Sequence, residues 1–330
     1  MKRALSLAAF MSLLLTGAAH AATRDFPVSA LPALTDVYPD RVTAFPDGVT
    51  GLADVVYSAL PGFRPMIVDI YMPKDTAPKP LILYIHGGGW MGGHTRHSGA
   101  LSDFPEVLAR LASEGFVVAS LEYRLSGEAP FPAQLQDARA AIRFLKANAA
   151  KYGIDASRVG VWGGSAGGHL TGLIATSCGE TGVDPAPAPA GSECVQAAVT
   201  WYGVFDFAPM LKKAAAAPNP TSAEYSLLRC RPEDCTAEQV AAVSPVAHVD
   251  RNDPPMLLIH GEKDSVVDVS QSHMMEARLR SVGVPVDAIY IPGVDHSFVG
   301  ATPEETRAAT LKATNATFDF FHTALKVPTK

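Results

Sequence analysis

Charged side chains are scarce in this chain, and no cluster of basic residues stands out. Asp, Glu, Lys and Arg make up 18% of the 330 residues, against about a quarter in a typical globular protein, and the net charge is −6. The lack of a basic patch argues against a nucleic-acid partner. Hydrophobic residues reach 48%, which is enough to bury a core, so long disordered stretches are not expected.

Cysteine is absent from most of the sequence. The four cysteines fall in one third of the chain, and none of their spacings is the C-x-x-C pair of a structural zinc site, so we expect no metal. An even number favours disulfides, for which four cysteines allow three pairings. We expect the pairs Cys178–Cys194 and Cys230–Cys235, because each closes a short loop in a stretch rich in Gly and Pro.

The apolar run near the N-terminus is short for a membrane span. It covers 4–15, follows Lys2 and Arg3, and precedes the small-residue motif AHA at 19–21. This order predicts a secretory signal peptide over 1–21, with a membrane anchor as the competing interpretation. The mature chain is then expected in the periplasm or the medium, without a stable membrane anchor, where disulfides persist.

Apolar runs and helical periodicity alternate along the rest of the chain. Strands are expected at 54–58, 66–72, 81–86, 116–121, 158–162, 195–201, 256–260 and 286–291, and helices at 100–112, 133–150, 166–177, 269–282 and 302–325. This alternation predicts an α/β fold in which helices cover both faces of a mostly parallel sheet. Asp69 is expected to face the wetter side of that sheet.

One segment interrupts this rhythm. Residues 203–249 lie between two late strands and are far longer than a usual connection. We expect a single domain over 22–330 with 203–249 as an insert. The insert either caps the carboxyl ends of the strands, where ligands bind in such sheets, or decorates a remote surface.

A glycine-dense turn follows the apolar run 159–162. Its pattern, Gly163-x-Ser165-x-Gly167, is that of a nucleophile elbow, in which a serine sits in strained backbone between a strand and a helix. Small flanking residues let the strand and helix approach closely, and the helix N-terminus favours a developing negative charge. On its own the pattern also fits an ordinary glycine-rich turn.

A nucleophilic serine needs a histidine base, which comes last in the chain order of this kind of site. Of the late histidines, His273 and His322 fall inside expected helices, whereas His296 lies in a turn-rich loop after the last strand. That loop is at the carboxyl end of a strand, so we expect His296 to be the base.

The acid that orients the base is expected after the strand 256–260. Glu262, Asp264 and Asp268 are the candidates, and Asp268 has a competing role as a helix cap. Asp264 lies in the turn directly beyond the strand and is the favoured choice. Its role would be to hold the tautomer of His296 without taking the proton.

A tetrahedral intermediate also needs an oxyanion hole. The motif HGGG at 86–89 follows a buried strand and matches the type in which bare glycine N–H groups point at the oxyanion. We expect Gly88 or Gly87 to supply one donor and Ala166 the other, with a flexible turn as the alternative. Trp90 either forms a wall of the acyl pocket or is simply packed.

Six motifs occur together in the chain: 86–90 (HGGGW), 123–125 (YRL), 130–134 (PFPAQ), 163–170 (GGSAGGHL), 242–246 (AVSPV) and 254–264 (PPMLLIHGEKD). In combination they resemble the α/β-hydrolase esterase/lipase superfamily, and specifically the secreted carboxylesterases related to bifunctional acetylxylan/feruloyl esterases. The resemblance covers about 54–325 and implies an α/β-hydrolase fold, Asp264 as the acid, and acetylated or feruloylated carbohydrate as substrate. Unlike hormone-sensitive-lipase-like relatives, the chain has Gly164, not an acidic residue, before the serine.

The motifs and the resemblance therefore predict a secreted serine carboxylesterase. It would act on short-chain or aromatic acyl esters of small molecules or carbohydrates, with neither cofactor nor metal. A serine peptidase of the prolyl-oligopeptidase type shares the Ser–Asp–His order and is the alternative within the same class. A catalytically inactive hydrolase fold used for binding is the alternative from another class.

Overall fold

A computed structural model describes residues 41–75, 77–185, 189–216, 219, 221–231 and 233–328. The expected signal peptide at 1–21 lies outside these residues. Within them one nine-stranded sheet has the order β1-β2-β3-β5-β4-β6-β7-β8-β9. The strands are β1 (Val42–Ala44), β2 (Thr50–Ser58), β3 (Met66–Met72), β4 (Lys79–Ile85), β5 (Val117–Leu121), β6 (Ile154–Gly164), β7 (Ala197–Trp201), β8 (Met256–Gly261) and β9 (Val286–Ile291).

The sheet is parallel from β5 to β9 along this order and antiparallel from β1 to β5. Every residue of β5, β7 and β8 is buried, as continuous apolar strands are when helices cover both faces. The predicted α/β class and mostly parallel sheet are confirmed. The short edge strand β1 was not predicted.

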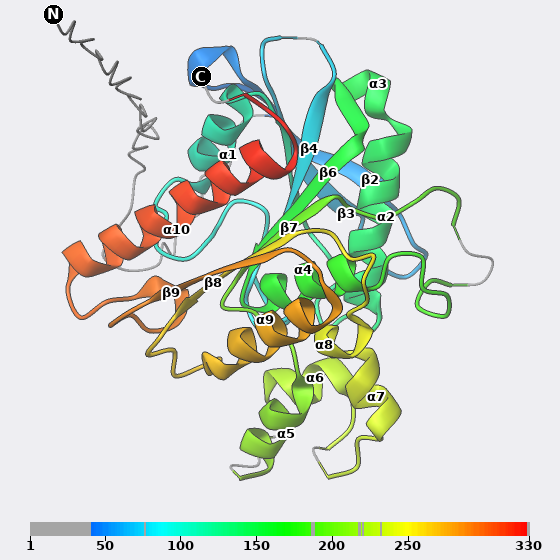
Figure 1. Cartoon of the computed structure of the whole chain (residues 1–330). Coiled ribbons are helices and arrows are strands. Elements are labelled where there is room, and N and C mark those ends of the chain that lie inside the picture. The colour runs from blue at the N-terminus through cyan, green and yellow to red at the C-terminus, as the bar shows by residue number, and fades with distance from the viewer. Residues whose placement is uncertain are drawn as a thin grey trace, which may run out of the picture.

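Helices pack on both faces of the sheet (Figure 1). One face carries α1 (Phe104–Ser113) and α10 (Pro303–Ala324), which share a buried cluster with Trp162 and Trp201. The other face carries α2 (Ala133–Ala147), α4 (Ala166–Thr176) and α9 (Ser270–Val282). The helix expected over 133–150 is interrupted at Asn148, after which α3 (Ala149–Tyr152) begins.

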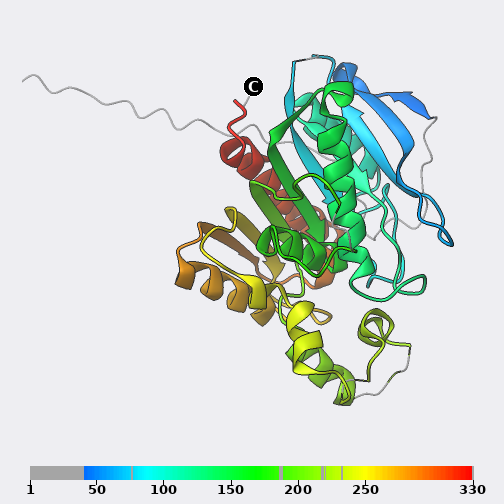
Figure 2. The same ribbon diagram turned by 90° about the vertical axis from the view of Figure 1, so that its right-hand side faces the viewer.

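The segment 203–249 forms a small helical layer at one end of the molecule (Figures 1 and 2). Its helices are α5 (Phe207–Ala216), α6 (Ala223–Leu228), α7 (Ala237–Ala242) and α8 (Pro245–His248). Arg229 donates a hydrogen bond to the carbonyl of Ser126 (2.7 Å), and Lys213 donates to that of Ser265 (2.9 Å). These contacts tie the segment to two loops that follow strands of the main sheet.

Two disulfides connect the cysteines. They are Cys178–Cys194 and Cys230–Cys235, which confirms both expected pairings. The first closes a loop between α4 and β7, and the second closes a short loop within 203–249. In the residues that the model describes, no helix combines the length and the apolar character that crossing a membrane requires.

Candidate active site

The polar side chains singled out from the sequence gather at the carboxyl ends of neighbouring parallel strands. His86 follows β4, Ser165 follows β6, Asp264 lies just beyond β8, and His296 comes after β9. Because these strands run in one direction, their carboxyl ends meet at one edge of the sheet, where ligands bind in open α/β folds.

Ser165 occupies a tight turn between β6 and α4. Its backbone has φ 56° and ψ −122°, a conformation that residues other than glycine rarely adopt. Its N–H donates to the carbonyl of Trp201 (2.9 Å). A methyl group on Gly163 would lie 2.4 Å from the carbonyl oxygen of Gly167, and one on Gly167 would lie 2.0 Å from that of Ile85. Glycine is therefore required at both flanking positions.

His296 lies between Ser165 and Asp264. It begins the short 3-10 helix η2 (His296–Phe298), and its Nδ1 donates to Asp264 Oδ2 over 2.8 Å. Its Nε2 lies 3.0 Å from Ser165 Oγ, so the serine hydroxyl donates to this nitrogen. The imidazole is 17% exposed and the carboxylate 0%, so the base reaches the surface while the acid is shielded from water.

Asp264 is held ionised despite its burial. Desolvation alone would raise its pKa, but hydrogen bonds from His260 and His296, and the attraction to His296 when that ring is protonated, outweigh this effect, so the pKa lies well below its usual value. The backbone N–H groups of Val266 and Val267 also donate to Oδ1, at 3.0 and 2.8 Å. A carboxylate with this set of donors can hold the imidazole and stabilise its charged form.

The other candidates for base and acid lie elsewhere. Asp268 accepts from the N–H of Ser270 (2.9 Å), and Glu262 is exposed to solvent. His322 is buried against Glu114 (2.9 Å), and the ring of His273 packs on Tyr290. Among the described residues, the side chain that bonds to Ser165 Oγ is His296, not one of these four.

Two of the predicted oxyanion donors, Gly87 and Gly88, line the same cavity as Ser165, and the third, Ala166, follows the serine in the chain. A methyl group on Gly87 would lie 3.4 Å from Ser165 Cβ, and Gly88 has φ 112°, a backbone that favours glycine. Within the described residues, neither Gly87 nor Gly88 donates its N–H to a backbone carbonyl. Ala166 is the first residue of α4, so its N–H has no partner within the helix. All three groups are available to an oxygen beside Ser165.

His86 supports this glycine loop. Its Nδ1 donates to the carbonyl of Gly87 (2.7 Å), and its ring stacks on Tyr123 at 4.3 Å. Burial lowers the pKa of His86 to about 4, so the imidazole is neutral at pH 7. Because Nδ1 carries the proton, Nε2 is left as an acceptor.

A cavity of about 450 Å³ opens beside Ser165. Glycines and polar side chains make up most of its lining. The polar residues in it include His86, His97, Ser98, Tyr202, His296 and Ser297. Trp90 does not line it. The Trp90 indole N–H donates to His169 Nδ1 (3.1 Å), its ring packs on Phe207, and it is 3% exposed, so Trp90 is packed.

Sequence reasoning missed two residues of this cavity. His97 lines it with a buried Nε2 that has no hydrogen-bond partner among the described residues. Tyr202 packs its ring 4.7 Å from that of His296, and its hydroxyl hydrogen-bonds with Ser297. Tyr202 directly follows β7, so its place at a strand's carboxyl end was a usable signal. His97 lies in a loop and offered none.

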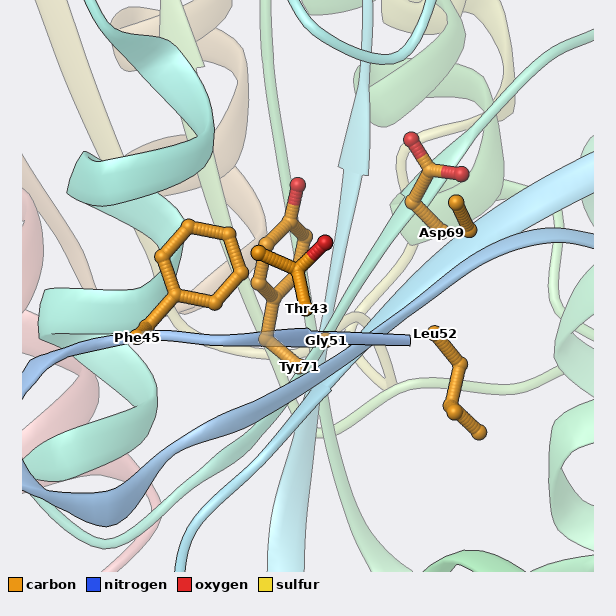
Figure 3. A pocket seen from close by; sticks show the side chains of 7 residues that line it. Thr43, Phe45, Gly51, Leu52, Asp69 and Tyr71 are labelled. Atoms are coloured by element: carbon orange, nitrogen blue, oxygen red, sulfur yellow. The ribbon is translucent and has the colours of Figure 1, made fainter. Parts of the chain in front are cut away.

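A buried ion pair fixes the loop that carries His97. Arg96 Nε lies 2.8 Å from Asp69 Oδ2, and its Nη2 donates to Asp54 Oδ1 over 2.6 Å. Asp69 is 2% exposed and borders a narrow crevice on the β1–β3 side of the sheet (Figure 3). The expectation that Asp69 faces the wetter side was therefore wrong, because the carboxylate is needed as a partner for Arg96.

Comparisons with known proteins find a family of hydrolases and several esterases. The model of the BD-FAE family matches residues 68–279. Esterase LipC of Mycobacterium tuberculosis is 35% identical over 242 residues, which cover 70% of this chain and 57% of LipC. Esterase LipQ of the same organism is 31% identical over 250 residues, 74% of this chain and 57% of LipQ. The chain thus spans little more than half the length of these relatives.

Solved structures are similar over more of their length. A truncated carbohydrate esterase from gut microbiota has a TM-score of 0.69 and 29% identity, and the match covers 88% of this chain and all of that one. An acetyl ester-xyloside bifunctional hydrolase from Caldicellulosiruptor lactoaceticus has a TM-score of 0.65 and 26% identity, covering 81% of this chain and 95% of the other.

Proposed function

The chain belongs to the BD-FAE family and has the α/β-hydrolase fold, and from that premise we propose that it is a carboxylesterase with Ser165 as nucleophile. The observation that carries the proposal is the continuous hydrogen-bonded path from Ser165 Oγ through His296 to Asp264, at 3.0 and 2.8 Å. The esterase relatives and the carbohydrate esterase structures support the same reaction class.

The reaction begins when Ser165 Oγ attacks the ester carbonyl and His296 Nε2 takes the hydroxyl proton. The carbonyl oxygen becomes an oxyanion that accepts hydrogen bonds from the N–H groups of Ala166 and Gly88, with Gly87 as the alternative donor. His296 then gives its proton to the leaving alcohol, which departs and leaves an acyl group on the serine. Water, activated by His296, attacks the acyl-enzyme and releases the acid. Asp264 stabilises the imidazolium in both halves of the cycle.

The proposed substrates are short-chain or aromatic acyl esters of hydroxyl-rich alcohols such as carbohydrates. A cavity of about 450 Å³ suits a small acyl group. Two of the histidines that line it, His86 and His97, have a buried Nε2 without a hydrogen-bond partner among the described residues. Hydroxyl groups both donate and accept, so they satisfy such nitrogens where an alkyl chain does not. The solved carbohydrate esterases support this choice.

We also propose that the mature chain, 22–330, is a single exported domain. Two disulfides suit an oxidising compartment, and the N-terminal pattern at 1–21 is that of a signal peptide. The insert 203–249 borders the site: a methyl group on Gly89 would lie 3.4 Å from Ala223 Cβ in α6. Among the described residues that line the cavity, none comes from 203–249. We therefore propose that the insert lies at the rim of the site and does not form its wall.

The test is an acyl-length series with wild type and Ser165→Ala. We expect turnover of p-nitrophenyl acetate, methyl ferulate and acetylated xylan, falling towards p-nitrophenyl palmitate, and no cleavage of proline-containing peptides. Ser165→Ala is expected to lower kcat by at least about 10⁴-fold and to lose labelling by a fluorophosphonate probe. Ser102→Ala, at an exposed serine, is the matched control and keeps both. Near-normal ester hydrolysis by Ser165→Ala contradicts the proposal. If the wild type cleaves the peptides and not the esters, the result favours a peptidase.

A further inference from the structure

A second histidine contacts the acid of the proposed triad. His260 lies in β8, is 0% exposed, and has hydrogen-bond partners on both ring nitrogens. Its Nδ1 lies 2.7 Å from Ser272 Oγ in α9, and its Nε2 lies 2.9 Å from the carbonyl oxygen of Val267. The same Nε2 lies 3.2 Å from Asp264 Oδ2.

These partners determine the tautomer of His260. A carbonyl oxygen can only accept, so the nitrogen that faces Val267 must carry a proton. A serine hydroxyl can both donate and accept, so Ser272 can donate a hydrogen bond to an unprotonated Nδ1. In that arrangement the imidazole of His260 carries its proton on Nε2. That single N–H is shared between the carbonyl of Val267 and the carboxylate of Asp264.

Two imidazoles thus converge on one carboxylate oxygen. Asp264 Oδ2 receives Nδ1–H of His296 at 2.8 Å and Nε2–H of His260 at 3.2 Å, whereas Oδ1 is occupied by backbone N–H groups. Rotation of the carboxylate about its Cβ–Cγ bond would break these contacts together. The shorter bond to His296 is the stronger one, and the longer contact to His260 takes a smaller share of the charge on Oδ2.

We propose that His260 is a positioning residue, which fixes the direction of Asp264 Oδ2 towards His296 and limits how much negative charge that oxygen presents to the base. The inference rests on the proposed function, since it assigns His260 to the same Ser165–His296–Asp264 site. Ser272 acts one step further out: by donating to Nδ1 it keeps the proton of His260 on the nitrogen that faces Asp264.

Other titratable groups also face this pair. Lys213 of α5 donates to the carbonyl oxygens of Ser265 and Val266, in the turn that carries Asp264. Asp268, Asp295 and Tyr202 interact electrostatically with His260 or Asp264 from three further segments. A substitution of Ser272 leaves all of these groups in place, so its effect reports on His260.

The experiment compares His260→Leu, His260→Gln and Ser272→Ala with wild type. Leucine removes the donor to Asp264, whereas glutamine can place an N–H near the position of Nε2. For His260→Leu we expect kcat on p-nitrophenyl acetate to fall roughly 10- to 100-fold with little change in KM, because a catalytic group displaced by about 1 Å can cost about 100-fold in rate. Its acid limb of kcat/KM should move up by roughly half to one pH unit, because His296 then faces the full charge of Asp264.

His260→Gln is expected to restore most of the rate, and Ser272→Ala to fall between the two. Ser281→Ala, on the exposed side of the same helix, is the matched control and behaves as wild type. Thermal unfolding confirms that each variant is folded. A folded His260→Leu with the wild-type rate and pH profile overturns the proposal, and so does a His260→Gln that is no better than His260→Leu.

A second measurement does not depend on activity. Long-range ¹H–¹⁵N NMR of the histidine side chains in the wild-type protein at pH 7 is expected to assign the proton of His260 to Nε2. A proton on Nδ1 overturns the inference, as does an imidazolium. If the wild type neither cleaves esters nor reacts with the fluorophosphonate, the proposed function fails, and the tautomer can still be read. The two failures are therefore distinguishable.

Discussion

The two walls of the cavity beside Ser165 are held in place by different forces. One, the elbow wall (85–88 and 163–169), is built from backbones in direct contact: methyl groups on Gly163 and Gly167 would meet carbonyl oxygens at 2.4 and 2.0 Å. The other, the loop wall (94–99 and 265–267), is fixed by side chains. Arg96 anchors it on Asp69, and Lys213 holds its second part by donating to Ser265.

This difference determines how each wall tolerates change. Where two backbones touch, no side chain larger than hydrogen fits, and relief requires the sheet and helix to separate. Where a long side chain bridges a gap, substitutions remove a limited amount of energy and leave the strands where they are. We therefore expect changes in the elbow wall to affect folding and chemistry, and changes in the loop wall to affect selectivity.

The largest effect is expected for Gly163→Ala. The added methyl group would collide with the backbone of Gly167 and, at 2.8 Å, with the carbonyl oxygen of Ile85. Since neither backbone can move without separating α4 from the sheet, we expect a loss of at least about 4 kcal/mol in the free energy of unfolding, measured with urea. Gly127→Ala is the control, because a methyl group there meets nothing within 4 Å. Equal stability of both variants would show that the elbow wall is not held by backbone contact.

The second largest effect is expected from acid, which should lower the free energy of unfolding through two buried histidines of the elbow wall. Burial lowers the pKa of His86 and of His169 to about 4, from an ordinary value of 6.5. Between these values the unfolded chain binds protons that the folded protein does not, so stability falls as pH falls from about 6.5 to about 4. Each histidine contributes a loss of up to about 3 kcal/mol over this window.

Urea unfolding at pH 7.5, 6 and 5 measures this slope. His169→Gln carries no titrating imidazole at that position, so its stability should fall less steeply with acid than that of wild type, whatever its absolute value. Asp264 acts in the same direction at lower pH, because its lowered pKa gives stability that is lost as the carboxylate protonates. If the free energy of unfolding falls equally with pH in wild type and His169→Gln, the lowered pKa of His169 is not a source of the acid sensitivity.

Gly88→Ala tests the chemistry of the elbow wall. Gly88 has φ 112°, and a methyl group on it would lie 2.3 Å from the carbonyl oxygen of Gly92. The loop must shift, which moves the N–H of Gly88 away from the oxyanion. We expect kcat to fall by about 10²- to 10³-fold, the usual result of losing one such donor, with a smaller change in KM. Gly92→Ala is the matched control within the same loop, since a methyl group there meets nothing within 4 Å.

The elbow wall is also the part of the site that its sequence marks most clearly. Continuous apolar runs identify the buried parallel strands, and the glycines around Ser165 are local requirements of one tight turn. Both kinds of signal lie within a few residues, so the fold class and the positions of the turns were predictable. The roles of Ser165, His296 and Asp264 in catalysis remain predictions that the variants above test.

The loop wall was not predictable in this way, because its contacts join residues far apart in the sequence. Asp69 reads as the polar position of an alternating strand, and only the fold reveals that Arg96 covers it. The same holds outside the loop wall for His260, which lies in an apolar strand and whose neighbours in the sequence do not indicate the contact with Ser272 on the following helix. The hydrophobic periodicity of a strand indicates which of its faces is buried. It does not indicate which distant residue will pair with a charged side chain on that face and so offset the cost of its burial.

The smallest effect is expected in the loop wall, for His97→Leu. His97 lines the cavity, and its buried Nε2 has no partner among the described residues, so we expect the ring to turn and accept a hydrogen bond from a substrate hydroxyl. A hydrogen bond of ordinary strength is worth about 0.5–1.5 kcal/mol, so KM for an acetylated sugar should rise roughly 2- to 10-fold. The intact ester p-nitrophenyl acetate has no free hydroxyl group to bond to His97. Its KM should therefore stay within about twofold of the wild-type value. Met91→Leu, at an exposed position of the same loop, is the control. If His97→Leu changes the KM for both substrates equally, the loop wall does not recognise the alcohol part of the ester. The proposed difference between the two walls is then wrong at this position.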